Sequence, residues 1–278
     1  MFNFLYLAHS QERFRRQALF SVLSLLHYLK DSSLEHRIVV YTDDEAFFRP
    51  LDIVTQPLSV ERITEWKGEI DFVHRMKIEL MLHAQRKFEG RMMFLDSDNY
   101  IFADPIPFLR AWPEGTAIMD KLEYRLDRPA DRVGRKYKRF FSKAHKFGAS
   151  GARYSVNMQQ PCWNSGIIGI PPSDPGILTD VLSVCDDVHS QFRKHLSEQM
   201  AFCIVLNRNF NIIPFRDHTF HWFGHGQAIN GIIDNALSDY PDGDPDMWTG
   251  QVAGVGEQVL NAPLNRDKLP WYRRWSRK

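Results

Sequence analysis

The stretch RMMFLDSDNYIF, residues 91–102, joins an apolar run to two aspartates that lie two positions apart, Asp96 and Asp98. The apolar half has the composition of a buried strand. A turn at the end of such a strand can direct both carboxylates toward one point. Hard divalent cations such as Mg²⁺ or Mn²⁺ prefer carboxylate and phosphate oxygens. The stretch therefore predicts a strand whose carboxyl end holds a metal, with a solvated acidic turn as the simpler alternative.

Strand and helix patterns alternate on the N-terminal side of this stretch, which predicts an α/β fold with a mostly parallel sheet. In such sheets the ligand crevice lies at the carboxyl ends of the strands, where Asp43, Asp44, Asp96 and Asp98 are all expected. Gly90 is expected to end the helix that precedes the strand leading to Asp96 and Asp98. The predicted strands are 2–8, 37–42 and a weaker run at 51–54, and the predicted helices are 15–30 and 72–88.

The C-terminal side continues the same alternation with two long interruptions. Residues 121–160 lack clear periodicity, so we expect a long functional loop or an insert that orders on binding. Residues 239–256 are rich in Asp, Gly and Pro and are expected to form a loop. The other predicted elements are a strand at 163–170, two helical pieces within 175–206 and a strand at 210–215.

The bulk composition is that of a soluble globular protein. The 278 residues are 44% hydrophobic and 25% charged, with a net charge of +1. Three cysteines are an odd count and argue against a disulfide scaffold, which fits a reducing compartment. The N-terminus is expected to be a first strand rather than a signal peptide, and no apolar stretch approaches the ~20 residues of a membrane span. The cytoplasm is therefore the expected location.

Two segments concentrate positive charge. Residues 121–153 contain eleven Lys and Arg against three acids, and residues 266–278 contain six against one. The rest of the chain is acidic, so an anionic partner is expected at these segments. The second segment mixes Trp and Tyr with its cations, a combination that suits a lipid headgroup interface on the inner face of a membrane. One alternative is a basic tail that packs its tryptophans on the domain. Another is that both basic segments meet an anionic glycan or nucleic acid.

Three polar motifs follow the aspartate pair in order. Asn164-Ser165-Gly166 interrupts an apolar run, and its side chains can hydrogen-bond to sugar hydroxyls while the glycine permits close approach of a backbone. Ser197-Glu198-Gln199 opens an apolar helical stretch. His221-Trp222-Phe223-Gly224 follows the last predicted strand.

This ordered set resembles the GT-A-fold glycosyltransferases, most closely family 8, the glycogenin and galactosyltransferase group, over roughly residues 1–225. The resemblance implies one catalytic domain over 1–265, with a nucleotide- and metal-binding half (1–104) and a donor-sugar and acceptor half (105–265) that carries the basic loop 121–160. It implies a UDP-sugar donor, Mn²⁺ or Mg²⁺, and retention of anomeric configuration. The implied metal ligands are Asp96, Asp98 and His221; the implied catalytic residues are Glu198 and Gln199; the implied donor contacts are Arg75, Lys77, Asp96, Ser97, Asn164, Ser165, Gly166 and Gly224.

The sequence departs from the family at three positions. The family usually carries an acidic residue after the first strand, where this chain has Ala8-His9-Ser10, so the base stays open. A Lys-Pro-Trp commonly follows the His-x-x-Gly, where this chain has His225-Gly226-Gln227, so Arg75, Lys77 or a basic-loop residue would replace the missing cation. Glu198 stands where Asp is usual.

With retention the leaving phosphate can take the acceptor proton; inversion would need a base, for which the candidates are Asp120, Glu198 and Asp217.

Several alternatives stay open at this point. The D-x-D strand also occurs in haloacid-dehalogenase-type phosphatases, where the first Asp, here Asp96, is a nucleophile. A non-catalytic nucleotide-sugar-binding protein could keep the same fold. The spacing of His218, His221 and His225 allows a zinc site. Arg75 and Lys77 could belong to an exposed helix face, and Asp43 and Asp44 could cap a helix.

The expected partners follow from the predicted chemistry. They are a nucleotide-sugar donor, a glycan, lipid-linked or protein acceptor that enters beside the basic loop, and a membrane surface contacted by the 266–278 tail. Nucleic acid is not expected.

Overall fold

The computed structural model describes residues 1–143, 146–148, 154–172, 176–223 and 225–263. Three predictions fall wholly or partly outside these residues: the donor contact of Gly224, the membrane contact of the 266–278 tail, and the part of the basic segment at 144–145 and 149–153. The described chain forms two compact units that interleave along the sequence. Unit 1 comprises Met1–Leu5, Leu58–Leu95 and Trp112–Arg216, and unit 2 comprises Tyr6–Pro57, Asp96–Ala111 and the chain from Asp217.

The main sheet has the strand order β12-β6-β11-β4-β1-β2-β3, and β1 contributes residues to both units. The pairs β1–β4, β2–β3 and β6–β12 are parallel, and β11 is antiparallel to both β4 and β6. This arrangement confirms the predicted α/β class with a mostly parallel sheet. The strands of this sheet are β1 (Phe2–Ala8), β2 (His36–Thr42), β3 (Val54–Pro57), β4 (Arg91–Leu95), β6 (Thr116–Met119), β11 (Ile167–Ile170) and β12 (Asn211–Pro214).

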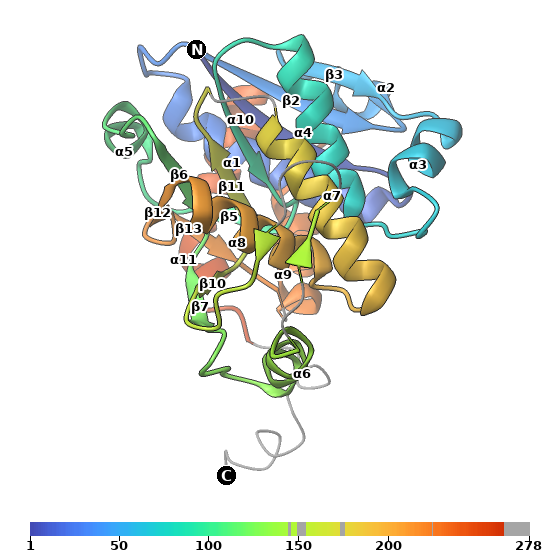
Figure 1. Ribbon diagram of the computed structural model, residues 1–278. Helices are drawn as coiled ribbons and strands as arrows, with labels where there is room; N and C mark the ends of the chain where they lie inside the picture. Colours follow the sequence, from blue (N-terminus) through green and yellow to red (C-terminus); the bar gives the residue numbers. More distant parts are fainter. Residues whose placement is uncertain (144–145, 149–153, 173–175, 224, 264–278) are drawn as a thin grey trace. The chain divides into compact units, whose positions relative to one another are not determined.

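Unit 1 builds its core from β4 and the helices that pack beside it. Met92, Met93, Phe94 and Leu95 are all at most 3% exposed, so the apolar run predicted as a strand is buried on both faces. Helix α4 packs on β4, and α7 packs against α4 and α8 (Figure 1). The helices of unit 1 are α3 (Val60–Lys67), α4 (Arg75–Lys87), α6 (Arg132–Phe141), α7 (Gly176–Gln191) and α8 (Ser197–Asn209); its short strands are β7 (Leu122–Arg125), β8 (Lys146–Phe147), β9 (Tyr154–Ser155) and β10 (Pro161–Trp163).

Unit 2 is organised around α1 (Glu12–Leu29). Ten of its residues are buried, and it contacts β5, α9 and α10. The hydroxyl of Ser24 accepts a hydrogen bond from the backbone N–H of Ile101 at 3.0 Å, which ties α1 to β5. The other helices of unit 2 are α2 (Glu45–Phe48), α5 (Ile106–Arg110), α9 (Gly226–Ala236), α10 (Pro245–Gly254) and α11 (Gly256–Leu260); its short strands are β5 (Asn99–Ile101) and β13 (Thr219–His221).

The structure differs from the sequence prediction in several segments. The predicted loop 121–160 contains β7 and α6, and the predicted loop 239–256 contains α10. The weak strand expected at 51–54 begins instead at Val54, because that is where pairing with β2 starts. The single strand expected at 163–170 is two strands, β10 and β11, separated at Asn164-Ser165-Gly166. Helix α4 ends at Lys87 with Phe88 as its C-cap, so the expectation that Gly90 ends this helix is wrong; Gly90 has φ +109° in the connection to β4.

The three cysteines are buried and unbridged, as the odd count predicted. Burial raises the pKa of the Cys162 thiol to about 12 and raises the pKa of Cys185 and Cys203 as well. Among the described residues no helix is both long and apolar enough to cross a bilayer.

Candidate functional site: an Asp-Asp-His cluster and two polar clusters

The aspartate pair lies in a turn between β4 and β5. Leu95 ends β4, and Asp96, Ser97 and Asp98 follow as half-buried residues before β5 begins at Asn99. A buried strand followed at once by a turn places polar side chains at the carboxyl end of that strand. The predicted location of the two carboxylates is therefore the one that the chain adopts.

His221 reaches the pair through strand pairing within unit 2. Strand β13 is antiparallel to β5 with His221 opposite Asn99, and the N–H of Trp222 donates to the carbonyl of Asp98 at 3.0 Å. As a result, Nε2 of His221 lies 3.1 Å from Oδ1 of Asp98. One ligand atom from each of Asp96, Asp98 and His221 lies within 4.8 Å of the others.

This geometry fits a divalent cation. Two neighbouring ligands at about 2.1 Å from one octahedral cation lie about 3.0 Å apart, which matches the Asp98–His221 separation. Two carboxylates supply the hard oxygens that Mg²⁺ and Mn²⁺ prefer, and all three residues are half-buried rather than sealed in the core. The residues predicted as metal ligands are thus brought together.

The other two histidines of the proposed zinc spacing do not join the cluster. His218 contacts the ring of Phe108, with centroids 5.2 Å apart, and Nδ1 of His225 lies 2.8 Å from the carbonyl oxygen of Ala262. Among the described residues, His221 is the one of these three histidines that belongs to the group of potential metal ligands. A site built from His218, His221 and His225 together is therefore not formed.

Asn99 supports the turn that carries Asp96 and Asp98, and the sequence analysis did not single it out. Its side chain is completely buried. Its amide nitrogen donates to the carbonyl of Asp96 at 3.1 Å, and its amide oxygen accepts from the hydroxyl of Thr219 at 3.2 Å. One side chain thus links the turn that carries the aspartates to the strand that carries His221.

We expect Asn99→Ala to weaken Mn²⁺ binding about tenfold, because residues that orient metal ligands typically contribute this much to affinity. Manganese titration followed by electron paramagnetic resonance measures the change. Thr219→Val serves as a graded comparison, since it removes one of the two hydrogen bonds and should weaken binding less. Affinity equal to that of the native protein in Asn99→Ala would show that the turn needs no such support.

Lys77 lies in a buried polar cluster of unit 1. Its Nζ is 3.3 Å from Oε1 of Glu198, donates to the carbonyl of Ser165 at 2.9 Å and lies 5.0 Å from the ring centroid of Phe94. Glu198 also accepts from the hydroxyl of Ser165 at 3.3 Å. The side chains of Lys77 and Glu198 are 6% and 4% exposed, so the alternative in which Lys77 belongs to an exposed helix face is wrong.

Arg75 makes contacts of a different kind. Its guanidinium donates to both carboxylate oxygens of Asp186, at 2.8 and 3.3 Å, to Glu79 at 2.8 Å and to the carbonyl of Trp66 at 2.8 Å. These bonds tie α4 to α7 and to α3. The side chain is 11% exposed, so Arg75 is not part of an exposed face either, and its predicted contact with a diphosphate stays a prediction.

A second polar cluster joins the Asn164-Ser165-Gly166 motif to the Ser197-Glu198-Gln199 motif. Glu123 of β7 accepts from the amide of Asn164 at 3.0 Å and from the amide of Gln199 at 3.0 Å. Asn164 in turn accepts from the N–H of Gly166 at 2.8 Å, which closes the turn between β10 and β11. In the sequence, Glu123 is one of the three acids of the basic segment 121–153, and no local pattern marks it as a binding residue.

The candidate bases for an inverting reaction have different surroundings. Asp120 is 2% exposed, and its N–H donates to the carbonyl of Asn164 at 3.2 Å. Asp217 is exposed. Glu198 is buried and pairs with Lys77.

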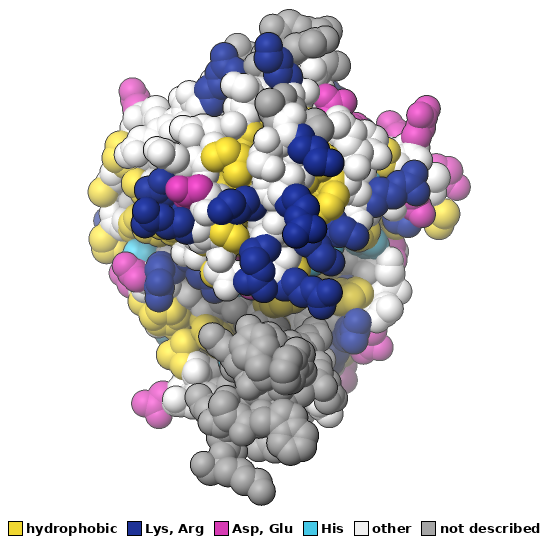
Figure 2. All heavy atoms as spheres, turned by 60° about the horizontal axis from the view of Figure 1, so that its bottom comes forward, with side chains coloured by type: hydrophobic (Ala, Val, Ile, Leu, Met, Phe, Trp, Pro, Cys, Tyr) yellow, Lys and Arg dark blue, Asp and Glu magenta, His cyan; other side chains and the backbone are white. Residues whose placement is uncertain are grey.

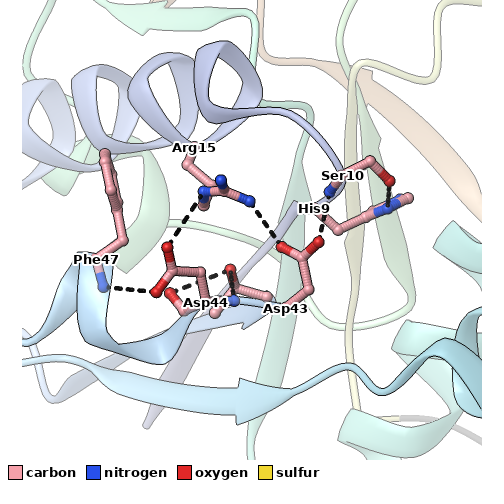
Figure 3. Close-up of polar contacts among 7 residues, drawn as sticks. His9, Ser10, Arg15, Asp43, Asp44 and Phe47 are labelled. Carbon is pink, nitrogen blue, oxygen red and sulfur yellow. Dashed lines mark hydrogen bonds and ion pairs between the residues drawn. The ribbon is translucent and has the colours of Figure 1, made fainter.

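The turn after β1 is closed by an acid that directly follows β2 (Figure 3). Ser10 has φ +73°, and its N–H donates to Asp43 at 2.8 Å, while Arg15 donates to the other oxygen of Asp43 at 2.9 Å. Asp44 caps α2 by accepting from the N–H of Phe47 at 3.2 Å. The capping alternative is thus confirmed for Asp44, and Asp43 instead holds the turn at Ser10.

No family model and no curated protein matches this sequence. Among solved structures, the galactosyltransferase LgtC has a TM-score of 0.49 at 10% identity, over 76% of this chain and 72% of that one. Mouse xyloside xylosyltransferase 1 has a TM-score of 0.47 at 11% identity, over 76% and 84%. The glycosyltransferase GlyE of Streptococcus pneumoniae TIGR4 has a TM-score of 0.47 at 11% identity, over 93% and 62%. At these identities and TM-scores, the similarities do not assign the chain to a family.

Proposed function

We propose that this protein is a metal-dependent glycosyltransferase of the GT-A type, which moves a sugar from a nucleotide-diphosphate sugar to an acceptor. The observation that carries the proposal is the convergence of Asp96, Asp98 and His221 to within 4.8 Å after a buried strand. The order of the sequence motifs, which resembles glycosyltransferase family 8, agrees with it. A UDP-sugar is the proposed donor and Mn²⁺ or Mg²⁺ the proposed ion.

The proposed roles follow from the chemistry of each side chain. Asp96, Asp98 and His221 would hold the ion, which when bound neutralises charge on the leaving diphosphate. The donor would also contact Ser97 and Gly224, and its sugar would contact Asn164, Ser165, Gly166 and Gln199. Lys77 and Arg75 carry the positive charge proposed to act toward the diphosphate or the sugar, and Glu198 is proposed as part of the catalytic pair with Gln199.

In the proposed reaction the bond between the anomeric carbon and the diphosphate oxygen breaks, and a bond from that carbon to the acceptor oxygen forms. Configuration is proposed to be retained. With retention the leaving phosphate can take the acceptor proton, so no enzymic base is needed. Asn164 and Gln199 offer amide groups that can orient sugar hydroxyls, and Glu123 holds both amides in place. Orientation of this kind lowers the entropic part of the barrier.

A panel of UDP-, GDP-, CMP- and dTDP-sugars, each with Mn²⁺ and with EDTA, tests the proposal. A ligand that binds the native state raises the melting temperature by mass action. We expect at least one sugar nucleotide, a UDP-sugar first, to raise it with Mn²⁺ and not with EDTA, and the same compound to be slowly hydrolysed to free sugar.

Two other results would contradict the proposal. Metal-dependent release of inorganic phosphate from simple phosphomonoesters, with a trapped phosphoryl group on Asp96, would favour the haloacid-dehalogenase-type alternative. Tight binding of a sugar nucleotide in EDTA, without turnover in Mn²⁺, would favour a non-catalytic binding protein.

A further inference from the structure

Helix α6 presents two faces of opposite character in unit 1. Tyr137 and Phe141 are at most 2% exposed. Tyr137 packs edge-on against Phe192 at 5.0 Å between ring centroids, and Phe141 packs against Phe147 at 5.5 Å. Asp131 caps the helix by accepting from the N–H of Gly134 at 2.7 Å. These contacts hold the helix in one orientation, so the opposite face is presented as a fixed array.

That opposite face is made of cations. The helix contains five Lys and Arg and no acid. All five are exposed, and the exposed Lys143 follows the last turn. We call the four residues Arg132, Arg135, Lys136 and Arg139 the basic face of α6.

The three acids of residues 121–143 are engaged elsewhere. Asp127 pairs with Arg125 at 3.1 Å, Asp131 caps the helix, and Glu123 accepts from Asn164 and Gln199. Within the described part of the chain, no ion pair involves a residue of the basic face. The described residues of unit 1 therefore do not neutralise the charge of this face.

The arrangement opposes the stability of the helix. Arg132 and Lys136, and likewise Arg135 and Arg139, are four residues apart, and like charges at this spacing repel one another on a helix surface. Arg132 also stands in the first turn, where the helix dipole disfavours a positive charge. The repulsion within this face lowers the stability of the isolated protein. An anionic partner would remove that repulsion by supplying the opposite charge.

The shape and composition of the face indicate a planar anionic partner. Helix α6 lies at the lower end of Figure 1, and Figure 2, which turns that side forward, shows Lys and Arg side chains gathered there. The cations stand on the outer surface of a helix rather than in a pocket. The aromatic residues Tyr137 and Phe141 point inward, so they offer no platform for stacking on nucleic-acid bases. Clusters of four to eight Lys and Arg on an amphipathic helix are typical of binding to anionic lipid headgroups.

We propose that the basic face of α6 docks this protein on a bilayer rich in anionic lipid. Binding is electrostatic, because the apolar face of the helix is occupied by its own unit and cannot insert into the bilayer. The proposal stands on the charge of α6 alone and is independent of the proposed reaction and of the 266–278 tail.

Sedimentation of the full-length protein with lipid vesicles tests the proposal. Native protein is expected to bind vesicles of phosphatidylcholine with 40 mol% phosphatidylglycerol (roughly the charge density of an anionic leaflet) and to be released by salt, because surface charge is screened at high ionic strength. It is expected not to bind pure phosphatidylcholine. Each Lys or Arg near an anionic surface changes the partition coefficient about fivefold. The quadruple variant Arg132→Gln, Arg135→Gln, Lys136→Gln, Arg139→Gln should therefore bind at least about a hundredfold more weakly.

A matched variant controls for net charge. Arg13→Gln, Arg49→Gln, Arg86→Gln, Lys87→Gln removes the same charge from four exposed positions outside α6 and should bind anionic vesicles like the native protein. The melting temperature of the α6 variant should equal or exceed the native value, since it loses like-charge repulsion and no buried contact.

Three results would overturn the proposal. One is native-like vesicle binding by the α6 variant, and another is an equal loss in the control variant. The third is failure of native protein to bind anionic vesicles. If it then binds a soluble phosphorylated oligosaccharide through the same four residues, this face is a glycan site instead.

Discussion

Asp96→Asn is expected to lower metal-dependent turnover of the sugar nucleotide at least about a hundredfold, and Asp98→Asn to do the same. Each change removes one anionic ligand from a cluster of three and leaves the turn itself intact. The ion is proposed to stabilise charge on the leaving diphosphate, a contribution of several kcal/mol, and a tenfold change in rate corresponds to about 1.4 kcal/mol. Steady-state hydrolysis of the sugar nucleotide in saturating Mn²⁺ measures the loss.

Asp104→Asn is the matched control for these variants. Asp104 lies on the same segment of unit 2, and its carboxylate accepts from the N–H of Ile106 at 2.8 Å. Asparagine can make the same bond, so this variant should keep native activity and native Mn²⁺ affinity. Activity in Asp96→Asn that equals the native rate and still depends on Mn²⁺ would show that the ion binds elsewhere.

Lys77→Met is expected to destabilise the protein by about 3–5 kcal/mol, because it leaves the Glu198 carboxylate buried without its cation. The ammonium and the carboxylate are 3.3 Å apart, and both side chains are almost completely buried. Methionine fills the volume of the lysine stem but supplies neither the charge nor the hydrogen bond to Ser165. Urea unfolding followed by tryptophan fluorescence gives the free energy difference.

Two further variants separate the charge effect from loss of packing. Lys77→Met combined with Glu198→Leu removes both charges and is expected to be more stable than Lys77→Met alone, because no buried charge then lacks a partner. Lys87→Met changes an exposed lysine at the other end of α4 and should stay within about 0.5 kcal/mol of the native protein. A cost of less than about 1 kcal/mol in Lys77→Met would mean that water reaches Glu198 and replaces the lysine.

The missed helices show where local patterns fail. Helix α10 contains Pro245, Gly250 and Gly254, which lower helix propensity. It forms because Asp244 caps it and because Trp248 and Val252 are fully buried. Helix α6 contains a glycine and five cations, yet it forms because its aromatic residues pack against Phe147 and Phe192. In both helices tertiary packing overrides a weak local preference.

Gly134 in α6 illustrates the same dependence on distant residues. A Cβ at this position would lie 2.9 Å from Cβ of Pro129 and 3.0 Å from the ring of Tyr124. The glycine that weakens the helix in isolation therefore allows it to pack closely in the folded unit.

The sequence by itself determined the elements that depend on near neighbours. The buried strand β4, the turn with Asp96 and Asp98 at its end, and the alternation of helices with parallel strands all follow from short-range apolar patterns and turn-forming residues. Only the tertiary structure decided which distant polar groups meet. Pairing of β5 with β13 brings His221 beside Asp98, and packing within unit 1 buries Lys77 against Glu198 and joins Glu123 to Asn164 and Gln199. The physical reason is that periodicity reports which face of an element is buried, whereas a contact between distant residues depends on how the whole core packs.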